Sequence, residues 1–219
     1  MAVTLLPIET VSAVDAVATR LRDRILDGEL LPGSTVTENE VAAWYGVSRP
    51  TSKSAITVVI GEGLLTREAN KSAKVPKLSS GDVADLFLVR IPLELEAVRF
   101  VIATTRIPEG LAQAVQDVRS MTQAPPSRYV EADLRFHRLL VESVGSRRLT
   151  RVYRTIQGEI HLSMVQSQRV LGAERVSREH GQILEALRAG AETRAVDLMR
   201  RHLQDACHDI SRHLDRFEG

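Results

Sequence analysis

The sequence predicts a mainly α-helical protein with two units: a small N-terminal unit of helices and a short hairpin, then a larger C-terminal all-α helical bundle. Three observations predict this fold class. Apolar residues recur at helical spacing along most of the 219-residue chain. The composition is rich in leucine, valine, alanine, arginine and glutamate, which favours helices over sheets. Signals for a strand pair occur once, before residue 76, and every later segment has the helical pattern.

Composition narrows the classes of protein to consider. A hydrophobic fraction of 43% is enough to bury a real core, in one large domain or two small ones. Cys207 is the single cysteine of the sequence, so an intramolecular disulfide is impossible and a reducing cytoplasm is expected. No apolar run approaches the roughly 20 residues of a membrane span, and the N-terminus lacks the apolar core of a signal peptide. We therefore expect a cytoplasmic protein without a membrane partner.

The first predicted elements are a longer helix and a short one. Apolar residues recur at helical spacing over residues 11–27, and Gly28 ends the run. After a turn, Thr37 and Glu40 have the spacing of a capping box, with Thr37 as the N-cap and Glu40 three residues into the helix. Gly46 ends this short helix, so a tight turn follows it.

The next elements are a second short helix and a hairpin. Ser48 is a favourable N-cap, and Pro50 is tolerated in the first turn of the helix that follows. Gly63 ends this helix, and two short strands, 64–67 and 73–75, then flank a turn. This order of elements predicts a winged helix-turn-helix in residues 10–76, with the helix-turn-helix at about 37–62 and a linker at 77–80.

A winged helix-turn-helix suggests DNA binding. Its second helix enters the major groove, where the first residues of that helix reach base edges. Arginine pairs bidentately with guanine, whereas hydroxyl groups and lysine suit phosphate. The simpler alternative is a packing unit of three helices with an ordinary charged surface. The candidate DNA-contacting residues are Ser48, Arg49, Thr51, Ser52 and Lys53 in the helix, and Arg67, Asn70 and Lys71 in the hairpin.

Three stretches of this unit resemble the GntR family of bacterial transcription regulators. They read L-R-D-R-I-L-D-G-E-L-L-P-G, E-V-A-A-W-Y-G-V-S-R-P-T-S-K-S-A-I and E-G-L-L, in the order and spacing of the family. The resemblance covers about residues 10–76 and implies that Arg49 and Lys53 contact DNA. The operator sequence is not predictable, because several positions depart from the family pattern, among them Asn39, Pro50, Thr51, Ser54 and Ser72.

The segments after residue 80 are all predicted to be helical and to form a second unit over residues 81–217. Proline and glycine mark the breaks between them. The six predicted helices are 81–105, 108–122, 127–144, 147–170, 175–189 and 191–217.

Three of these helices carry a histidine on the side that should face the interior. They are His137, His180 and His202, and Asp133 lies one turn before His137 on the same side. One buried histidine is most often a satisfied core residue, but three with a carboxylate are harder to explain in that way. Unpaired buried polar groups cost roughly 1–3 kcal/mol each, and a shared metal ion would satisfy all four. Imidazole and carboxylate ligands suit Zn²⁺, Ni²⁺, Mn²⁺ or Fe²⁺.

Five further stretches resemble the FCD ligand-binding domain of the FadR subfamily within the GntR regulators, across about residues 80–216. They read V-R-I-P-L-E-L-E-A-V-R, D-L-R-F-H, S-V-G-S-R-R-L, E-H-G-Q-I-L-E-A-L and R-H-L. Six helices rather than seven are similar to the shorter, VanR-type form of the domain. The resemblance implies a divalent metal ion, with Zn²⁺ expected first, held by Asp133, His137, His180 and His202.

The same resemblance implies that a small organic acid binds beside the metal. Arg90 is the candidate for a second contact with its carboxylate. An internal salt bridge from Arg90 to Glu94 or Asp133 is an equal alternative. His161 is a further candidate for lining the effector cavity.

These observations favour one class of function over two others. The favoured class is a homodimeric transcription regulator, expected to be a repressor, that binds a pseudo-palindromic double-stranded DNA operator and responds to an organic acid. A metalloenzyme is the second, because three histidines and an aspartate with an open position can activate water. The sequence lacks H-E-x-x-H, G-x-S-x-G and P-loop patterns, so we predict that the protein is not an enzyme. The third is a regulator whose metal is purely structural.

Overall fold

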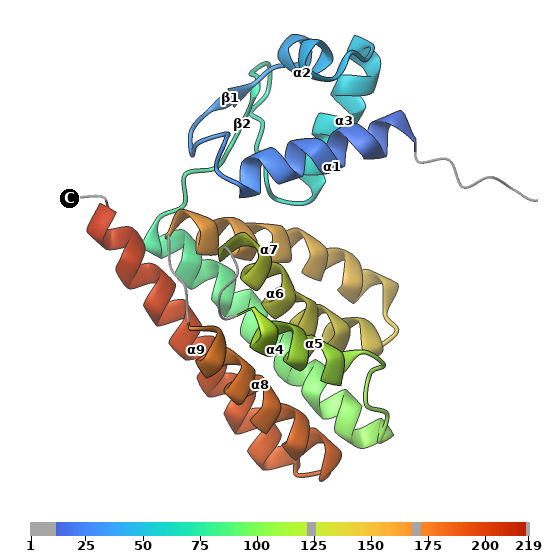
Figure 1. The fold of residues 1–219 in the computed structure, drawn as a ribbon, viewed down its shortest axis with the longest axis vertical. Coiled ribbons are helices and arrows are strands. Elements are labelled where there is room, and N and C mark those ends of the chain that lie inside the picture. The colour runs from blue at the N-terminus through green and yellow to red at the C-terminus, as the bar shows by residue number, and fades with distance from the viewer. Residues whose placement is uncertain (1–11, 122–125, 168–171, 218–219) are drawn as a thin grey trace, which may run out of the picture.

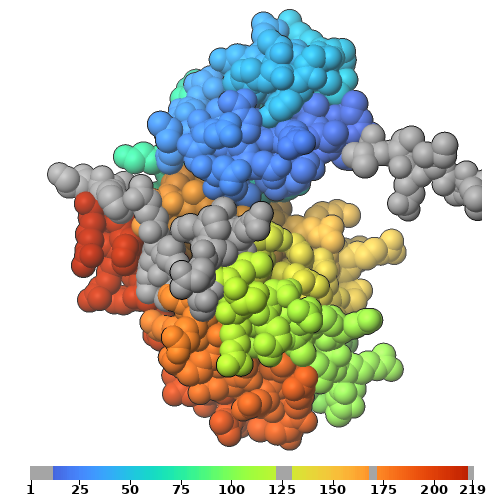
Figure 2. All heavy atoms as spheres, viewed as in Figure 1, coloured from blue at the N-terminus to red at the C-terminus, as the bar shows by residue number. Residues whose placement is uncertain are grey.

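The computed structural model describes residues 12–121, 126–167 and 172–217, and it has the mainly helical fold that the sequence predicts. An N-terminal unit of three helices and two short strands lies at the top of Figure 1, with the bundle of α4 to α9 beneath it. Figure 2 shows the N-terminal unit stacked on the helical unit. None of the described helices is both long and apolar enough to cross a membrane.

Capping residues set the ends of the helices in the N-terminal unit. The Thr37 hydroxyl accepts a hydrogen bond from the Glu40 amide at 3.2 Å, and the Glu40 carboxylate accepts one from the Thr37 amide at 2.9 Å, which confirms the capping box. Gly46 ends α2 in the left-handed region with φ of 63°, and Ser48 then caps α3. The helices are α1 (Ala13–Leu26), α2 (Glu38–Tyr45) and α3 (Arg49–Gly61).

The wing differs from the predicted hairpin. β2 (Ala73–Lys74) pairs in antiparallel fashion with β1 (Thr35–Val36), a strand that precedes the helix pair and was not predicted. On the other side of β2, Lys74 forms an isolated bridge with Thr66, with N–O distances of 2.9 and 2.8 Å. The predicted strand pair was therefore too long and incomplete, because a two-residue strand leaves no alternating pattern in the sequence.

The helical unit follows its predicted segments closely. The largest difference from the prediction is at the start of α5. This helix was predicted to begin at residue 108, but it begins at Leu111, directly after Gly110, which has φ of 79°. Predicted helical residues 122 and 168–170 lie outside the described residues. The helices are α4 (Ser80–Thr104), α5 (Leu111–Ser120), α6 (Pro126–Ser143), α7 (Arg147–Gln166), α8 (Ala173–Arg188) and α9 (Glu192–Phe217).

Two helices determine how the site and the N-terminal unit are positioned. α4 packs against α9, α6 and α7, so its buried side lies among the helices that carry the candidate metal ligands. α7 contacts both units: Ile160 packs into the core of the helical unit, whereas Leu162 packs into the core of the N-terminal unit. In Figure 1, α7 lies directly beneath the N-terminal unit.

Candidate metal centre and DNA-reading surface

The four predicted metal ligands converge inside the helical unit. Asp133 and His137 come from α6, His180 from α8 and His202 from α9. All four are buried, and each offers one ligand atom within 4.8 Å of the others. The His202 Nε2 atom lies 3.3 Å from His180 Nε2 and 3.2 Å from His137 Nε2. Asp133 Oδ1 lies 3.4 Å from His180 Nε2 and 3.9 Å from His137 Nε2.

This geometry suits a metal ion. Ligands at about 2.0–2.1 Å from a tetrahedral Zn²⁺ ion lie roughly 3.3–3.4 Å from one another, close to three of the four distances above. A histidine that binds a metal must be a neutral imidazole, and burial lowers the pKa of His137 below its usual value and that of His180 well below it. The buried group of one aspartate and three histidines can therefore bind a divalent metal ion.

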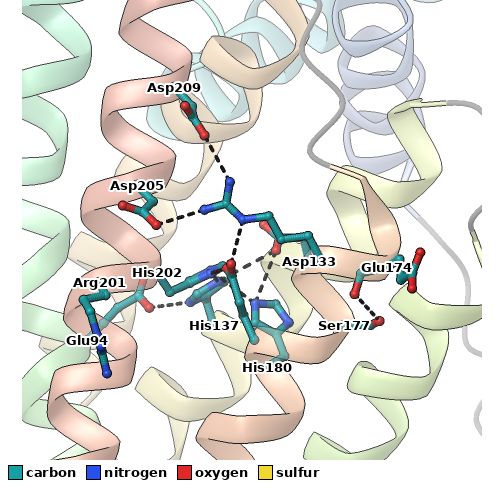
Figure 3. Close-up of polar contacts among 12 residues, drawn as sticks. Glu94, Asp133, His137, Glu174, Ser177, His180, Arg201, His202, Asp205 and Asp209 are labelled. Atoms are coloured by element: carbon teal, nitrogen blue, oxygen red, sulfur yellow. Dashed lines mark hydrogen bonds and ion pairs between the residues drawn. The ribbon is translucent and has the colours of Figure 1, made fainter.

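Carboxylates on the outer side orient two of the imidazoles. His137 Nδ1 lies 2.5 Å from Glu94 Oε2 (Figure 3). His202 Nδ1 lies 2.8 Å from Glu179 Oε2. A carboxylate that accepts the Nδ1 proton leaves the Nε2 lone pair free for a metal. Burial opposes ionisation of Glu179, yet hydrogen bonds from His202 and Arg175 lower its pKa to about 2.

Neither glutamate was predicted to orient a metal ligand. Glu94 was predicted only as a possible ion-pair partner of Arg90. No pattern in the sequence predicts a contact between Glu179 and His202, which lies 23 residues later. A sign was available for Glu94, because it lies one turn after Arg90 on the interior side of a helix.

Arg90 and Glu94 form a buried ion pair beside these ligands. The Arg90 Nε atom donates to Glu94 Oε1 at 2.6 Å, and the Tyr153 hydroxyl donates to the same oxygen at 2.7 Å. Burial alone would raise the pKa of Glu94, but its neighbours His137 and Arg90 hold it well below its usual range. Arg90 Nη2 is also buried and has no hydrogen-bond partner among the described residues. The alternative of an internal salt bridge is thus observed, and one guanidinium nitrogen remains available.

His161 lies elsewhere. It is 7% exposed and lines a separate cavity between the two units, with Gln157 and Leu134 beside it. A different cavity, of about 430 Å³, adjoins His202 and is lined by Arg194 and Arg201 among others.

The candidate DNA-reading residues gather around the start of α3 and the wing. Arg49, Arg67, Asn70 and Lys71 line one hollow of about 360 Å³. Thr51 is half-buried and Lys53 is exposed on α3, and Ser48 serves as its N-cap. The Glu38 carboxylate forms ion pairs with both arginines: Oε2 lies 3.3 Å from Arg49 Nε, and Oε1 lies 3.7 Å from Arg67 Nη1. Glu38 was not predicted as part of this surface.

Ser52 corrects one of the predictions. Its side chain is fully buried, and its hydroxyl donates to the Ser48 carbonyl at 3.2 Å. The residue faces the core of the N-terminal unit because it follows Ser48 by one helical turn and precedes the buried Ala55 and Ile56. The Ser52 hydroxyl is therefore unavailable to DNA.

The fold and these two sites define a class of protein: a transcription regulator that joins a DNA-binding winged helix-turn-helix to a helical effector-binding domain. The bacterial regulatory proteins of the gntR family match residues 13–75, and the FCD domain matches residues 85–205. The chain therefore belongs to the GntR family, in the FadR subfamily that carries a C-terminal FCD domain. Members of this family are regulators and not enzymes.

Individual proteins are similar over most of the chain. The HTH-type transcriptional regulator YdhC of Bacillus subtilis is 25% identical over 208 residues, which cover 90% of each chain. The probable D-xylose utilization operon transcriptional repressor of Paenarthrobacter nicotinovorans is 23% identical over 193 residues, 85% of each chain. A crystal structure of a GntR regulator from Rhodococcus sp. RHA1 has 26% identity and a TM-score of 0.77, and it covers 91% of this chain and 98% of that one.

Proposed function

We propose that the protein is a cytoplasmic homodimeric repressor whose affinity for its operator is controlled by a small organic acid bound beside a divalent metal ion. The observation that carries the proposal is the buried group of Asp133, His137, His180 and His202. Zn²⁺ is the proposed metal, because the distances between the ligand atoms suit its tetrahedral coordination. Repression is supported by the Paenarthrobacter relative, which is named a repressor.

The effector proposal rests on Arg90. Glu94 bonds both Arg90 and His137, so the unpartnered Nη2 of Arg90 lies close to the metal ligands. One oxygen of an organic acid would take an open position on the metal, while the other accepts a charge-assisted hydrogen bond from Nη2. The cavity beside His202 is the proposed entrance, because His202 itself lines it; Arg194 and Arg201 on its wall are balanced by Glu179 and Asp205.

Operator recognition is proposed for the exposed side of α3 and for the wing. Arg49, Thr51 and Lys53 would enter the major groove, with Arg67, Asn70 and Lys71 on adjacent backbone. A homodimer held together by the helical units would place two such helices about one DNA turn apart, roughly 34–36 Å, on a pseudo-palindrome.

α7 is the proposed route between the two sites. At one end of this route, Tyr153 donates to Glu94, the carboxylate that orients His137. Two residues on, Thr155 donates to the carbonyl of the last residue of α3 at 3.1 Å. At the far end of α7, Gln166 makes hydrogen bonds of 2.6 and 3.0 Å to the backbone of residues 76–78. An acid that shifts Glu94 would bias the position of α3, and so the population that binds DNA.

Footprinting on the promoter region of the protein's own gene, with and without a panel of small organic acids, tests this function. We expect protection of a pseudo-palindromic site that one acid weakens or removes. Protection that no acid changes would favour a purely structural metal. A promoter region that stays unprotected at every protein concentration would contradict the expectation that an operator of this protein lies there.

A further inference from the structure

Glu38 connects the three elements that form the DNA-reading surface. It is the first residue of α2, and its carboxylate contacts both Arg49, the first residue of α3, and Arg67 in the wing. Each of its two oxygens pairs with a different arginine, Oε2 with Arg49 and Oε1 with Arg67. One side chain therefore links the first helix of the pair, the recognition helix and the wing.

Glu38 is held in place more firmly than the arginine that it contacts. The capping box of Thr37 and Glu40 fixes the first turn of α2, where Glu38 lies. The residue before Arg67 is bridged to β2, which fixes the backbone of the wing at that point. The side chain of Glu38 is 21% exposed, whereas that of Arg49 is 69% exposed. Glu38 can therefore direct Arg49, rather than the reverse.

The contact determines which donors of Arg49 remain for DNA. Arg49 Nε donates to Glu38 Oε2 at 3.3 Å, and neither Nη atom of Arg49 bonds a residue within the described ranges. A guanidinium carries its N–H donors in a fixed planar fork. With Nε occupied, the pair of Nη1 and Nη2 is left to donate to O6 and N7 of a guanine.

Stabilisation of the fold does not explain this contact, because an ion pair with so exposed an arginine contributes little to folding stability. DNA that covers the surface would exclude water and strengthen the attraction between Glu38 and Arg49. The carboxylate would stay paired there, since Arg67 contacts its second oxygen. A carboxylate also repels phosphate, which opposes a nonspecific contact of Arg49 with the DNA backbone.

We propose that Glu38 is a positioning residue for operator recognition. It holds Arg49 in the orientation in which the two Nη atoms read one guanine, and it links that orientation to the wing through Arg67. Glu38 itself contacts no base. The inference rests on the operator recognition proposed above and adds the residue that sets its base preference.

Selection from a library of double-stranded DNA with a randomised centre supplies the probe, because it finds the preferred sequence of the full-length wild type without reference to a promoter. Each guanine of the selected sequence is then replaced by adenine in turn. Fluorescence anisotropy at low salt measures the Kd for each DNA, since phosphate contacts keep the binding of weakened variants measurable there. The guanine whose replacement weakens binding by the wild type but not by Arg49→Ala is the one that Arg49 reads.

Glu38→Ala is the test variant, and Glu68→Ala is the matched control. Glu68 provides the same charge in the wing, where it pairs with Lys71 at 2.5 Å, and it does not contact Arg49. We expect the wild type and Glu68→Ala to prefer guanine over adenine at that position by about tenfold or more, and Glu38→Ala by about threefold or less. Circular dichroism should be unchanged, because the capping box of α2 does not use Glu38.

An unchanged guanine preference in folded Glu38→Ala would overturn the proposal, and so would the absence of any guanine that depends on Arg49. An equal loss in Glu68→Ala would overturn it too, because charge alone would then explain the effect. Loss of a preference for cytosine, with the guanine preference intact, would show instead that Glu38 accepts from cytosine N4 and reads a base itself. A library without any sequence enriched by the wild type would contradict operator recognition as a whole, so the two proposals fail in distinguishable ways.

Discussion

His180 and His202 reach the same point as Asp133 and His137 although they lie in different helices. The sequence predicted all four residues, because each lies on the apolar side of its own helix. Their convergence could not be derived from periodicity alone, since it depends on how α6, α8 and α9 pack; the family resemblance supplied it. The sequence did not predict that Glu94 and Glu179 orient the imidazoles, because these contacts also depend on how the helices pack.

Replacing His180 should reduce metal binding. His180→Ala removes one of the Nε2 atoms that converge near Asp133. We expect bound metal, measured by elemental analysis after dialysis, to fall from about one ion per chain to well below half. His208→Ala provides the matched control, because His208 is exposed on α9. Full metal occupancy in His180→Ala would remove this residue from the coordination shell.

The buried His161 should make folding stability depend on pH. Because its pKa falls from 6.5 in the unfolded chain to about 4 in the folded one, the unfolded state binds the proton more strongly. Stability from this residue is therefore complete above pH 6.5 and is lost as the pH falls from 6.5 towards 4. The difference between these two pKa values corresponds to about 3 kcal/mol of unfolding free energy.

Urea unfolding of the wild type and of His161→Phe, without added anions, measures this effect. We expect the difference in unfolding free energy between the two proteins to change by up to about 3 kcal/mol between pH 7 and pH 4. A difference that stays constant with pH would show that His161 is not buried in its neutral form.

Among the elements, the helices were predicted well and the wing poorly. Thr37, Ser48 and Gly46 mark helix ends through local chemistry, so the sequence alone locates α2 and α3. β1 depends on pairing with a segment 37 to 39 residues away, Thr35 with Lys74 and Val36 with Ala73, and two residues carry no periodic signal. Elements defined by their own residues are predictable, whereas those defined by a distant partner are not.

The start of α3 should determine operator recognition. Arg49 is 69% exposed in its side chain and lines the hollow between α3 and the wing. We expect Arg49→Ala to remove specific operator binding in gel-shift assays, since a lost bidentate base contact costs roughly 1–3 kcal/mol. Fold and dimer should remain, as judged by circular dichroism and gel filtration. Arg20→Ala, on the exposed side of α1, controls for the loss of charge. Unchanged affinity in Arg49→Ala would contradict the assignment of α3.

Gly158 allows α7 to lie against the end of α3. A Cβ atom there would be 1.8 Å from the Glu62 carbonyl oxygen, so any side chain forces the two helices apart. We expect Gly158→Ala to lower the free energy of unfolding by about 1–3 kcal/mol through overpacking. The matched control is Gly181→Ala in α8, where a Cβ atom meets nothing within 4 Å and should stabilise the helix by about 0.5–1 kcal/mol.

Thermal unfolding by circular dichroism compares the two glycine variants. A Gly158→Ala protein as stable as Gly181→Ala would mean that α7 and α3 do not make this close contact. The only indication of this contact in the sequence is an isolated glycine, Gly158, within a helical pattern.

For the whole molecule, the two units were predictable and their contact was not. Each has its own apolar core, and the periodic patterns of the sequence define both. The contact between them depends on α7, which carries Leu162 into the core of the N-terminal unit and Gln166 to the backbone of residues 76–78. Periodicity identifies the buried side of a helix but not which of two units covers it.

Operator affinity with and without the metal site tests the central claim most directly. Fluorescence anisotropy at fixed salt would measure binding to the footprinted promoter DNA by the wild type, His180→Ala and His208→Ala, each with and without the effective acid. We predict that the acid weakens binding at least about tenfold, or 1.4 kcal/mol, in the wild type and His208→Ala, and has no effect in folded His180→Ala. An equal response in His180→Ala would contradict control through the metal centre.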